Sequence, residues 1–232
     1  MTPKILQNGK STILYDADRL GNAAALSFDR NELVSRGSIL GAAEGRGTTL
    51  FIEHDGQDIA LRHYHRGGFV SRFLEDDYLW LGLGRSRAWR EWHLLARLYQ
   101  QGLPVPAPLA ARVIRHGLLY TADIMTLRIP QAQPVSQLLM QQSLTEQAWR
   151  SIGACIARFH QQGVYHADLN ANNILLDHEQ QVFIIDFDRG EIRKPAVRWQ
   201  QANLERLLRS LNKFKNKMEN FYFSESDWQN LL

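Results

Sequence analysis

The sequence contains a single cysteine, Cys155, in 232 residues. One thiol excludes an internal disulfide framework and suits a reducing compartment. Cys155 shares the spacing of a helical face with Ile152, Ile156 and Phe159. We therefore expect it to pack in a protein core rather than to act as a reactive thiol.

Long hydrophobic runs are also missing. No stretch approaches the roughly 18 apolar residues that span a bilayer. Residues 1–20 carry charged and polar side chains throughout, unlike a secretory signal. The sequence therefore predicts a protein that is made and kept in the cytoplasm. With 44% hydrophobic and 10% aromatic residues, it has enough apolar side chains for one large domain or two small lobes.

Two acidic motifs lie on either side of a short apolar hairpin pattern. In the first motif, Asp168 is followed five positions later by Asn173 and then by the apolar residues 174–176. A polar turn leads into a second apolar run, 182–185, which ends at Asp186. This pattern indicates two buried strands whose ends carry two carboxylates and one carboxamide.

These three polar groups are the set that phosphoryl transfer needs. A carboxylate must accept the proton of the attacking hydroxyl, and hard oxygen ligands must hold the magnesium ions that bridge the nucleotide phosphates. Asp168 fits the first role as the catalytic residue, and Asn173 and Asp186 fit the second as metal ligands. The alternative interpretation is a β-hairpin with acidic turns and no catalytic function.

The order of these motifs resembles the protein-kinase-like superfamily, whose catalytic loop reads HxDLxxxxN and whose metal loop reads DFG. The resemblance implies an α+β, two-lobed fold with a β-rich N-terminal lobe and a small helical C-terminal lobe. It implies ATP and Mg²⁺ as cofactors. It also implies that His166 braces the loop backbone rather than acting as a base. The sequence departs from the pattern at Ala167, where regulated protein kinases have Arg, and at Asp188, where Gly would allow the loop to flip.

The resemblance also assigns a nucleotide-covering loop to the first half of the chain. Residues 41–47 form a glycine-rich turn between two strand patterns, and small residues in such a hairpin let backbone amides approach phosphates. In the family this turn covers the nucleotide, which implies cofactor-binding roles for Gly45, Arg46, Gly47 and Thr48. The turn matches neither GxGxxG nor GxxxxGK[ST], so a plain hairpin is the alternative.

Arg62 stands in the segment Ile-Ala-Leu-Arg, which resembles the VAIK strand of kinases with Arg in place of Lys. Either cation neutralises the α- and β-phosphates, Arg as a planar fork and Lys as a point charge. Glu91, in a helical pattern over residues 85–99, occupies the position of the family's helix Glu. We therefore expect an ion pair between Arg62 and Glu91, and both residues are candidates for nucleotide binding. The alternative is an edge-strand Arg that extends to solvent.

The chain is expected to divide into two lobes. Residues 1–127 comprise an N-terminal extension and a β-rich nucleotide-binding lobe, and residues 128–232 comprise a helical catalytic lobe with a basic aromatic tail. The first 35 residues are weakly patterned, and we expect them to pack on the lobe behind them. The boundary is placed near residues 126–130, where the resemblance implies that backbone groups pair with adenine.

The stretch after Asp188 is short and basic. A protein kinase needs an activation segment with an APE-like anchor and further helices that hold a peptide, and neither pattern is present. Instead, residues 198–214 have the spacing of an amphipathic helix with four leucines on one face. Residues 189–217 contain nine Lys or Arg against two Glu, and an aromatic segment follows.

Three further segments narrow the resemblance to the Kdo kinase family, where Kdo is 3-deoxy-D-manno-octulosonic acid. They are Arg-His-Tyr-His-Arg-Gly-Gly at 62–68, His-Ala-Asp-Leu-Asn at 166–170 and Asn-Leu-Glu-Arg-Leu-Leu-Arg-Ser-Leu at 203–211. The likeness covers residues 36–214. It implies ATP-dependent phosphorylation of the 4-hydroxyl of the Kdo sugar on a lipid A precursor, in the lipopolysaccharide core biosynthesis of Gram-negative bacteria.

That acceptor is an anionic glycolipid, so the basic tail implies a peripheral position on the anionic cytoplasmic face of the inner membrane. Three alternatives stay open: a small-molecule kinase of the aminoglycoside or choline type, a catalytically dead nucleotide-binding module, and a basic nucleic-acid-binding protein. The basic tail disfavours the first, since a cationic substrate needs an acidic pocket. The presence of Asp168, Asn173 and Asp186 disfavours the second. We expect no nucleic acid partner, and the sequence indicates no protein partner.

Overall fold

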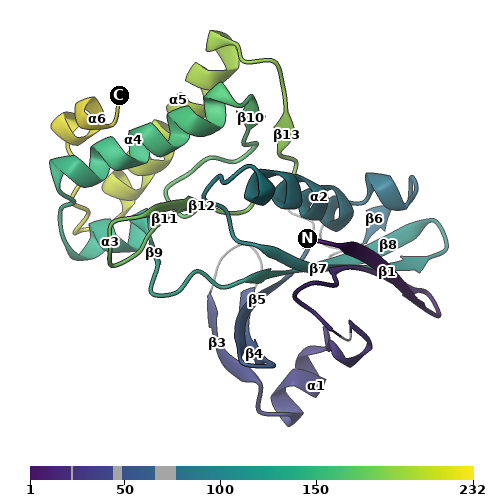
Figure 1. Ribbon diagram of the computed structural model, residues 1–232. Helices are drawn as coiled ribbons and strands as arrows, with labels where there is room; N and C mark the ends of the chain where they lie inside the picture. Colours follow the sequence, from purple (N-terminus) through teal and green to yellow (C-terminus); the bar gives the residue numbers. More distant parts are fainter. Residues whose placement is uncertain (22, 44–48, 66–76) are drawn as a thin grey trace. The chain divides into compact units, whose positions relative to one another are not determined.

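The computed structural model describes residues 1–21, 23–43, 49–65 and 77–232 (Figure 1). Within these residues, one large antiparallel sheet forms from strands of the first part of the chain, and helices predominate after residue 135. The predicted α+β class is therefore confirmed, in a form consistent with a kinase-like fold.

The chain divides into two compact units. The first comprises Met1–Gln100 with Ala107–Arg128, and the second comprises Gln101–Pro106 with Ile129–Leu232. The division thus follows Arg128, one residue beyond the expected position, and the proline-containing connector belongs to the second unit. The roles assigned to the two lobes stay predictions.

Eight strands form the sheet of the first unit within the described residues. In chain order they are β1 (Pro3–Asn8), β2 (Ser11–Asp16), β3 (Ile39–Ala43), β4 (Thr49–His54), β5 (Gln57–His63), β6 (Tyr78–Leu79), β7 (Pro108–His116) and β8 (Leu119–Leu127). The spatial order is β1-β2-β7-β8-β5-β4-β3, and β6 pairs with β8. Every pairing is antiparallel, as short turns between successive strands allow.

The N-terminal residues, which were expected to pack on the lobe, contribute two strands to its sheet. β1 and β2 form a hairpin, and β2 pairs with β7 along most of its length. The two-residue turn between them is Gly9-Lys10, since Asn8 pairs with Ser11, and Gly9 has a φ of 57°. Glycine at the first central position of a two-residue hairpin loop is a turn signal because it adopts a positive φ without strain. The sequence therefore contained the signal for this hairpin.

Helical segments lie on both faces of the sheet. They are the short 3₁₀ turns Ala23–Ala25 and Leu83–Arg85, and the helices α1 (Arg30–Ser35) and α2 (Arg87–Gln100). β5 alternates between the two faces: Ile59 and Leu61 are buried in a hydrophobic cluster with Leu33 of α1. Arg62 lies on the opposite face and contacts Glu91 of α2. The two-residue period of the strand therefore directs Arg62 to the helix that carries its predicted partner.

The second unit contains four α-helices and five short strands within the described residues. They are β9 (Gln133–Pro134), α3 (Val135–Gln141), α4 (Glu146–Gln161), β10 (Val164–Tyr165), β11 (Ile174–Leu176), β12 (Val182–Ile184), β13 (Glu191–Ile192), α5 (Val197–Lys217) and α6 (Glu225–Leu231). The strands form two small sheets, β10-β13 and β12-β11-β9. Across the described parts of the chain, no helix is both long and apolar enough to cross a membrane.

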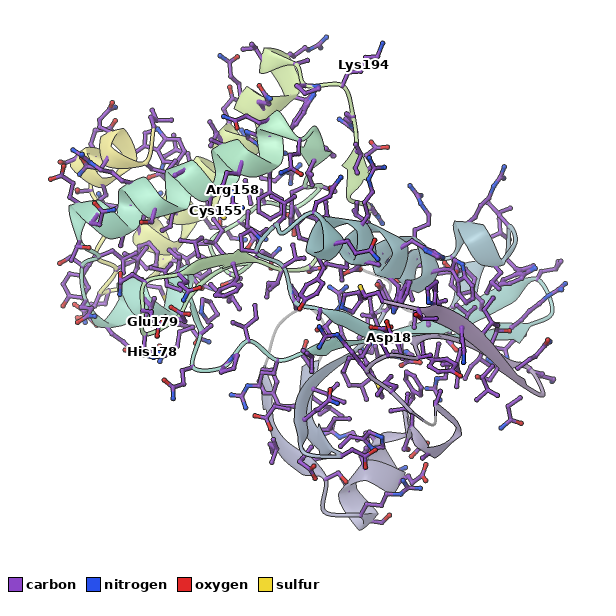
Figure 2. The ribbon with its side chains drawn as sticks, in the orientation of Figure 1. Asp18, Cys155, Arg158, His178, Glu179 and Lys194 are labelled. Carbon is purple, nitrogen blue, oxygen red and sulfur yellow. The ribbon has the colours of Figure 1, made fainter. Side chains whose placement is uncertain are left out.

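Cys155 lies on α4 and is 5% exposed, which confirms its predicted core position. Burial raises the pKa of its thiol to about 12, and the charge of Arg158 on the same helix only partly opposes this rise. Figure 2 shows both side chains on α4. The thiol is therefore protonated at neutral pH and is a poor nucleophile.

Candidate active site

The predicted hairpin is present and places two candidate metal ligands at one end. β11 and β12 pair in the register Ile174 with Ile184 and Leu176 with Val182. The residues just outside the register also meet, because the Ile185 N–H donates to the Asn173 carbonyl at 3.0 Å. Asn173 and Asp186 therefore emerge from the same end of the hairpin, as the sequence predicts.

Asp168 lies in the loop between β10 and β11, and its backbone is held at both ends of the residue. Its N–H donates to Nδ1 of His166 at 3.2 Å. Its carbonyl oxygen accepts from Nδ2 of Asn173 at 2.9 Å and from Nδ2 of Asn170 at 3.0 Å. The carboxylate itself is 52% exposed, so the loop fixes the backbone and leaves the acidic group accessible to a substrate.

His166 is buried and contacts both acidic loops. Its Nε2 lies 2.9 Å from the Ile185 carbonyl, and its Nδ1 accepts from the Asp168 N–H. A carbonyl can only accept, so these partners define a neutral ring with its proton on Nε2. Burial lowers the pKa of His166, while the Ile185 carbonyl and the carboxylates of Asp186 and Asp168 partly oppose this. The predicted bracing role of His166 is confirmed, since a buried neutral ring bound to two backbone groups holds the loops together.

The loop that begins at Asp186 starts with a backbone conformation that residues other than glycine rarely adopt. Asp186 has a φ of 63°, in the left-handed region, where most residues with a Cβ are strained and Asp is among the better tolerated. Such conformations persist where the surrounding structure fixes them, and they cluster at functional sites. The next residue, Phe187, is 1% exposed and packs against Phe159 and His166, with ring centroids 5.7 Å and 4.8 Å away. The loop is therefore anchored immediately beside Asp186.

Helix α5 contacts the loop of Asp168 at three points. Asn203 accepts from the His166 N–H at 3.3 Å and donates to the His166 carbonyl at 3.0 Å, and it is 2% exposed. Ser210 accepts from the Ala171 N–H at 3.3 Å. Between them, Nη1 of Arg206 lies 3.5 Å from Oδ1 of Asp168. Positions 203, 206 and 210 share one face of the helix, so a single element braces the loop along its length.

The first unit contains a separate charged cluster, which confirms the predicted ion pair. One terminal nitrogen of Arg62 lies 2.7 Å and 2.6 Å from the two carboxylate oxygens of Glu91. Tyr64 also donates its hydroxyl to Glu91, and the Arg62 guanidinium lies over the Tyr64 ring, 4.9 Å from its centroid. Glu91 is 3% exposed, so the pair is largely desolvated. Loss of one partner would leave a buried charge uncompensated, which typically costs about 3–5 kcal/mol.

The structure therefore brings together Asp168, Asn173 and Asp186 in one unit, and Arg62 with Glu91 in the other. The remaining predicted nucleotide-binding positions lie outside the described residues; they are Gly45, Arg46, Gly47 and Thr48. The nucleotide and metal roles of all these residues stay predictions.

Sequence reasoning missed the polar residues that support the predicted ones. Asn203, Arg206 and Ser210 lie in a helix whose leucines dominate its sequence pattern. Their spacing of three and four positions is the signal that could have revealed a polar stripe beside the apolar one. Tyr64 follows Arg62 by two positions and so projects from the same side of the chain. The strand alternation therefore also indicated that Tyr64 lies beside Arg62.

Residues 32–232 match the protein family described as lipopolysaccharide kinase (Kdo/WaaP) family. Curated relatives extend the similarity over nearly the whole chain. A 3-deoxy-D-manno-octulosonic acid kinase of Vibrio vulnificus (strain YJ016) is 38% identical over 226 residues, which cover 97% of this chain and 95% of the relative.

Two other relatives with the same name give similar values. The protein of Haemophilus influenzae (strain 86-028NP) is 39% identical over 233 residues, which cover 97% of this chain and 96% of the relative. That of Photobacterium profundum is 39% identical over 217 residues, which cover 94% of this chain and 91% of the relative. With the family match and these near full-length similarities added to the braced acidic loops, this chain belongs to the lipopolysaccharide kinase (Kdo/WaaP) family.

Proposed function

We propose that this protein transfers the γ-phosphoryl group of ATP to the 4-hydroxyl of a Kdo sugar on a lipid A precursor. Family membership and the shared name of the relatives support Kdo as the acceptor. The observation that carries the proposal is the hairpin end, where an accessible carboxylate at Asp168 adjoins Asn173 and Asp186. A small-molecule kinase of another type and a nucleic-acid-binding protein are not favoured, since the family match supports neither.

In the proposed reaction, Asp168 is the general base. The acceptor hydroxyl donates a hydrogen bond to the Asp168 carboxylate, and its oxygen attacks the γ-phosphorus. A phosphorus–oxygen bond forms to the sugar, the bond from the γ-phosphorus to the β,γ-bridging oxygen breaks, and ADP leaves. The hydroxyl proton passes to Asp168. Three hydrogen bonds to the backbone of Asp168 fix where its carboxylate can lie, which is the positioning that this chemistry requires.

Asn173 and Asp186 fit a magnesium site by the chemistry of their side chains. The Asn173 nitrogen is engaged by the Asp168 carbonyl, so its carboxamide oxygen is the end left to bind a cation. Mg²⁺ prefers oxygen ligands and binds through one or two protein groups plus substrate phosphates. When bound, the ion would neutralise the charge of the nucleotide phosphates. Arg62, held by Glu91, is the proposed partner of the α- and β-phosphates.

The basic segment after the metal loop supports a proposed peripheral position on an anionic membrane. Lys194 and Arg198 are exposed, and Figure 2 shows Lys194 extending outward from the connection between β13 and α5. Arg193 differs, because it pairs with Glu191 and lies over the Tyr165 ring, 3.5 Å from its centroid. Exposed cations near an anionic leaflet attract the protein to the surface that carries a lipid-linked acceptor.

The reaction itself is tested with ATP, Mg²⁺ and a purified Kdo-bearing lipid A precursor. We expect the acceptor to gain the mass of one phosphoryl group. Asp168→Asn should reduce turnover by about 10²- to 10⁴-fold, because a carboxamide cannot accept the proton. It should leave the apparent affinity for ATP nearly unchanged. Unchanged turnover in this variant would remove Asp168 from the mechanism, and no mass gain with the intact protein would refute the proposed acceptor.

The metal assignment predicts a changed magnesium requirement. Asp186→Ala and Asn173→Ala should each raise the Mg²⁺ concentration that gives half-maximal turnover, because each removes an oxygen ligand. Glu179→Ala is the matched control, since Glu179 is exposed in the turn at the other end of the same hairpin. The magnesium titration of the control should match that of the intact protein. Identical titrations for all variants would contradict the assignment.

The membrane proposal predicts salt-sensitive binding to vesicles that contain anionic phospholipid. Changing both Lys194 and Arg198 to Gln should weaken binding about 25-fold, because each cation near an anionic leaflet contributes about 1 kcal/mol. Arg150→Gln is the control, because Arg150 pairs with Glu146 on α4 and should make little difference. Sedimentation with vesicles measures the binding. Equal losses in the double variant and the control would show that these two residues form no specific docking surface.

A further inference from the structure

Arg206 contacts the proposed base directly. Its Nη1 lies 3.5 Å from Oδ1 of Asp168, and the two side chains are 44% and 52% exposed. Ion pairs this exposed contribute about 0–1 kcal/mol to stability, because solvent screens them. Folding stability alone therefore does not account for a guanidinium at this position.

The residues on either side of Arg206 fix α5 against the loop, and the Arg206 guanidinium stays accessible. Asn203 and Ser210, on the same face of α5, bind the backbone of the loop on either side of Asp168. Within the described residues, Asp168 is the one hydrogen-bond partner of the Arg206 guanidinium. A guanidinium has five N–H donors in a planar fork, so most of its capacity is available to a ligand.

The contacts of Asp168 indicate which ligand that is. Asn173, the candidate metal ligand, binds the Asp168 main-chain carbonyl, whereas Arg206 binds the carboxylate. The attacking hydroxyl must come within about 2.6–3.2 Å of that carboxylate to give up its proton. In the proposed reaction Arg206 is therefore a neighbour of the acceptor molecule.

We propose that Arg206 binds a carboxylate of the acceptor and thereby selects an acidic sugar. The inference rests on the proposed function, in which the acceptor is Kdo. In that sugar the carboxylate is attached to C2, two bonds from the carbon that carries the 4-hydroxyl. A guanidinium beside the base can therefore pair with the acid group while the hydroxyl lies against Asp168. Arg is suited to this role because its fork matches a carboxylate with two parallel hydrogen bonds.

The test compares two acceptors and four proteins. The acceptors are the Kdo-bearing lipid with its free carboxylate and the same lipid with that group converted to a carboxamide. With the intact protein, kcat/KM should favour the acid by about 10- to 100-fold, the value of one or two charge-assisted hydrogen bonds. Arg206→Gln should lose this preference, Arg206→Lys should keep part of it, and the KM for ATP should not change in either variant.

Arg209→Gln is the matched control on the same helix, because Arg209 pairs with Glu205 and is 66% exposed. It should keep the full preference for the acid. If Arg206→Gln lowers kcat/KM for both acceptors by one factor, Arg206 acts on Asp168 or on the phosphoryl group, and the inference is wrong. Retention of the full preference in Arg206→Gln would also overturn it. A third outcome is distinguishable from these two. If the intact protein phosphorylates neither acceptor, the proposed function is refuted and the inference loses its basis.

Discussion

The neutral imidazole of His166 joins the two acidic loops, and the arrangement of the candidate site depends on it. Nε2 donates to the carbonyl of Ile185, the residue before Asp186, and Nδ1 accepts from the N–H of Asp168. Only an uncharged ring can make both contacts, because an imidazolium has no acceptor. Burial maintains this state by lowering the pKa of His166. The proposed base and the proposed metal ligand are therefore positioned by one buried ring, and both ring nitrogens are engaged by backbone groups.

Helix α5 supplies the second constraint on the same loop. Asn203 binds the backbone of His166 through both its N–H and its carbonyl, and it does so from a buried position where unmet hydrogen bonds would be costly. Ser210 holds the loop again at Ala171. In regulated protein kinases, an Arg in the comparable loop pairs with a phosphorylated activation segment, whereas this chain has Ala167 at that position. Its loop is held by a helix of the same unit.

The parts of the site that could be predicted are those that local patterns encode. The β11–β12 hairpin follows from two apolar runs, and its register brings Asn173 and Asp186 to one end. The pair of Arg62 and Glu91 follows from the resemblance of their segments to the kinase VAIK strand and to the helix that carries its Glu partner. The first prediction needed only neighbours in sequence, and the second needed the known order of elements in the family.

The parts that could not be predicted depend on packing between distant segments. Asn203 binds a residue 37 positions earlier, and hydrophobic periodicity says nothing about a buried carboxamide. The tautomer of His166 follows from partners on two different loops, which the sequence alone does not identify. The N-terminal hairpin is a different case, because Gly9 in its turn was a readable signal, whereas the hydrophobic pattern of its strands is weak.

The pH dependence of this arrangement has a defined sign. The pKa of His166 is lower in the folded protein than the ordinary value of about 6.5, so the unfolded chain takes up the proton first as the pH falls. The contribution of His166 to stability is therefore present above about pH 6.5 and is lost as the pH falls through its folded pKa. Nitrogen-15 NMR of the His166 ring measures both the charge and the tautomer. We predict a neutral ring protonated on Nε2 at pH 7 that titrates below pH 6.5, whereas an imidazolium or a proton on Nδ1 at pH 7 would contradict the account.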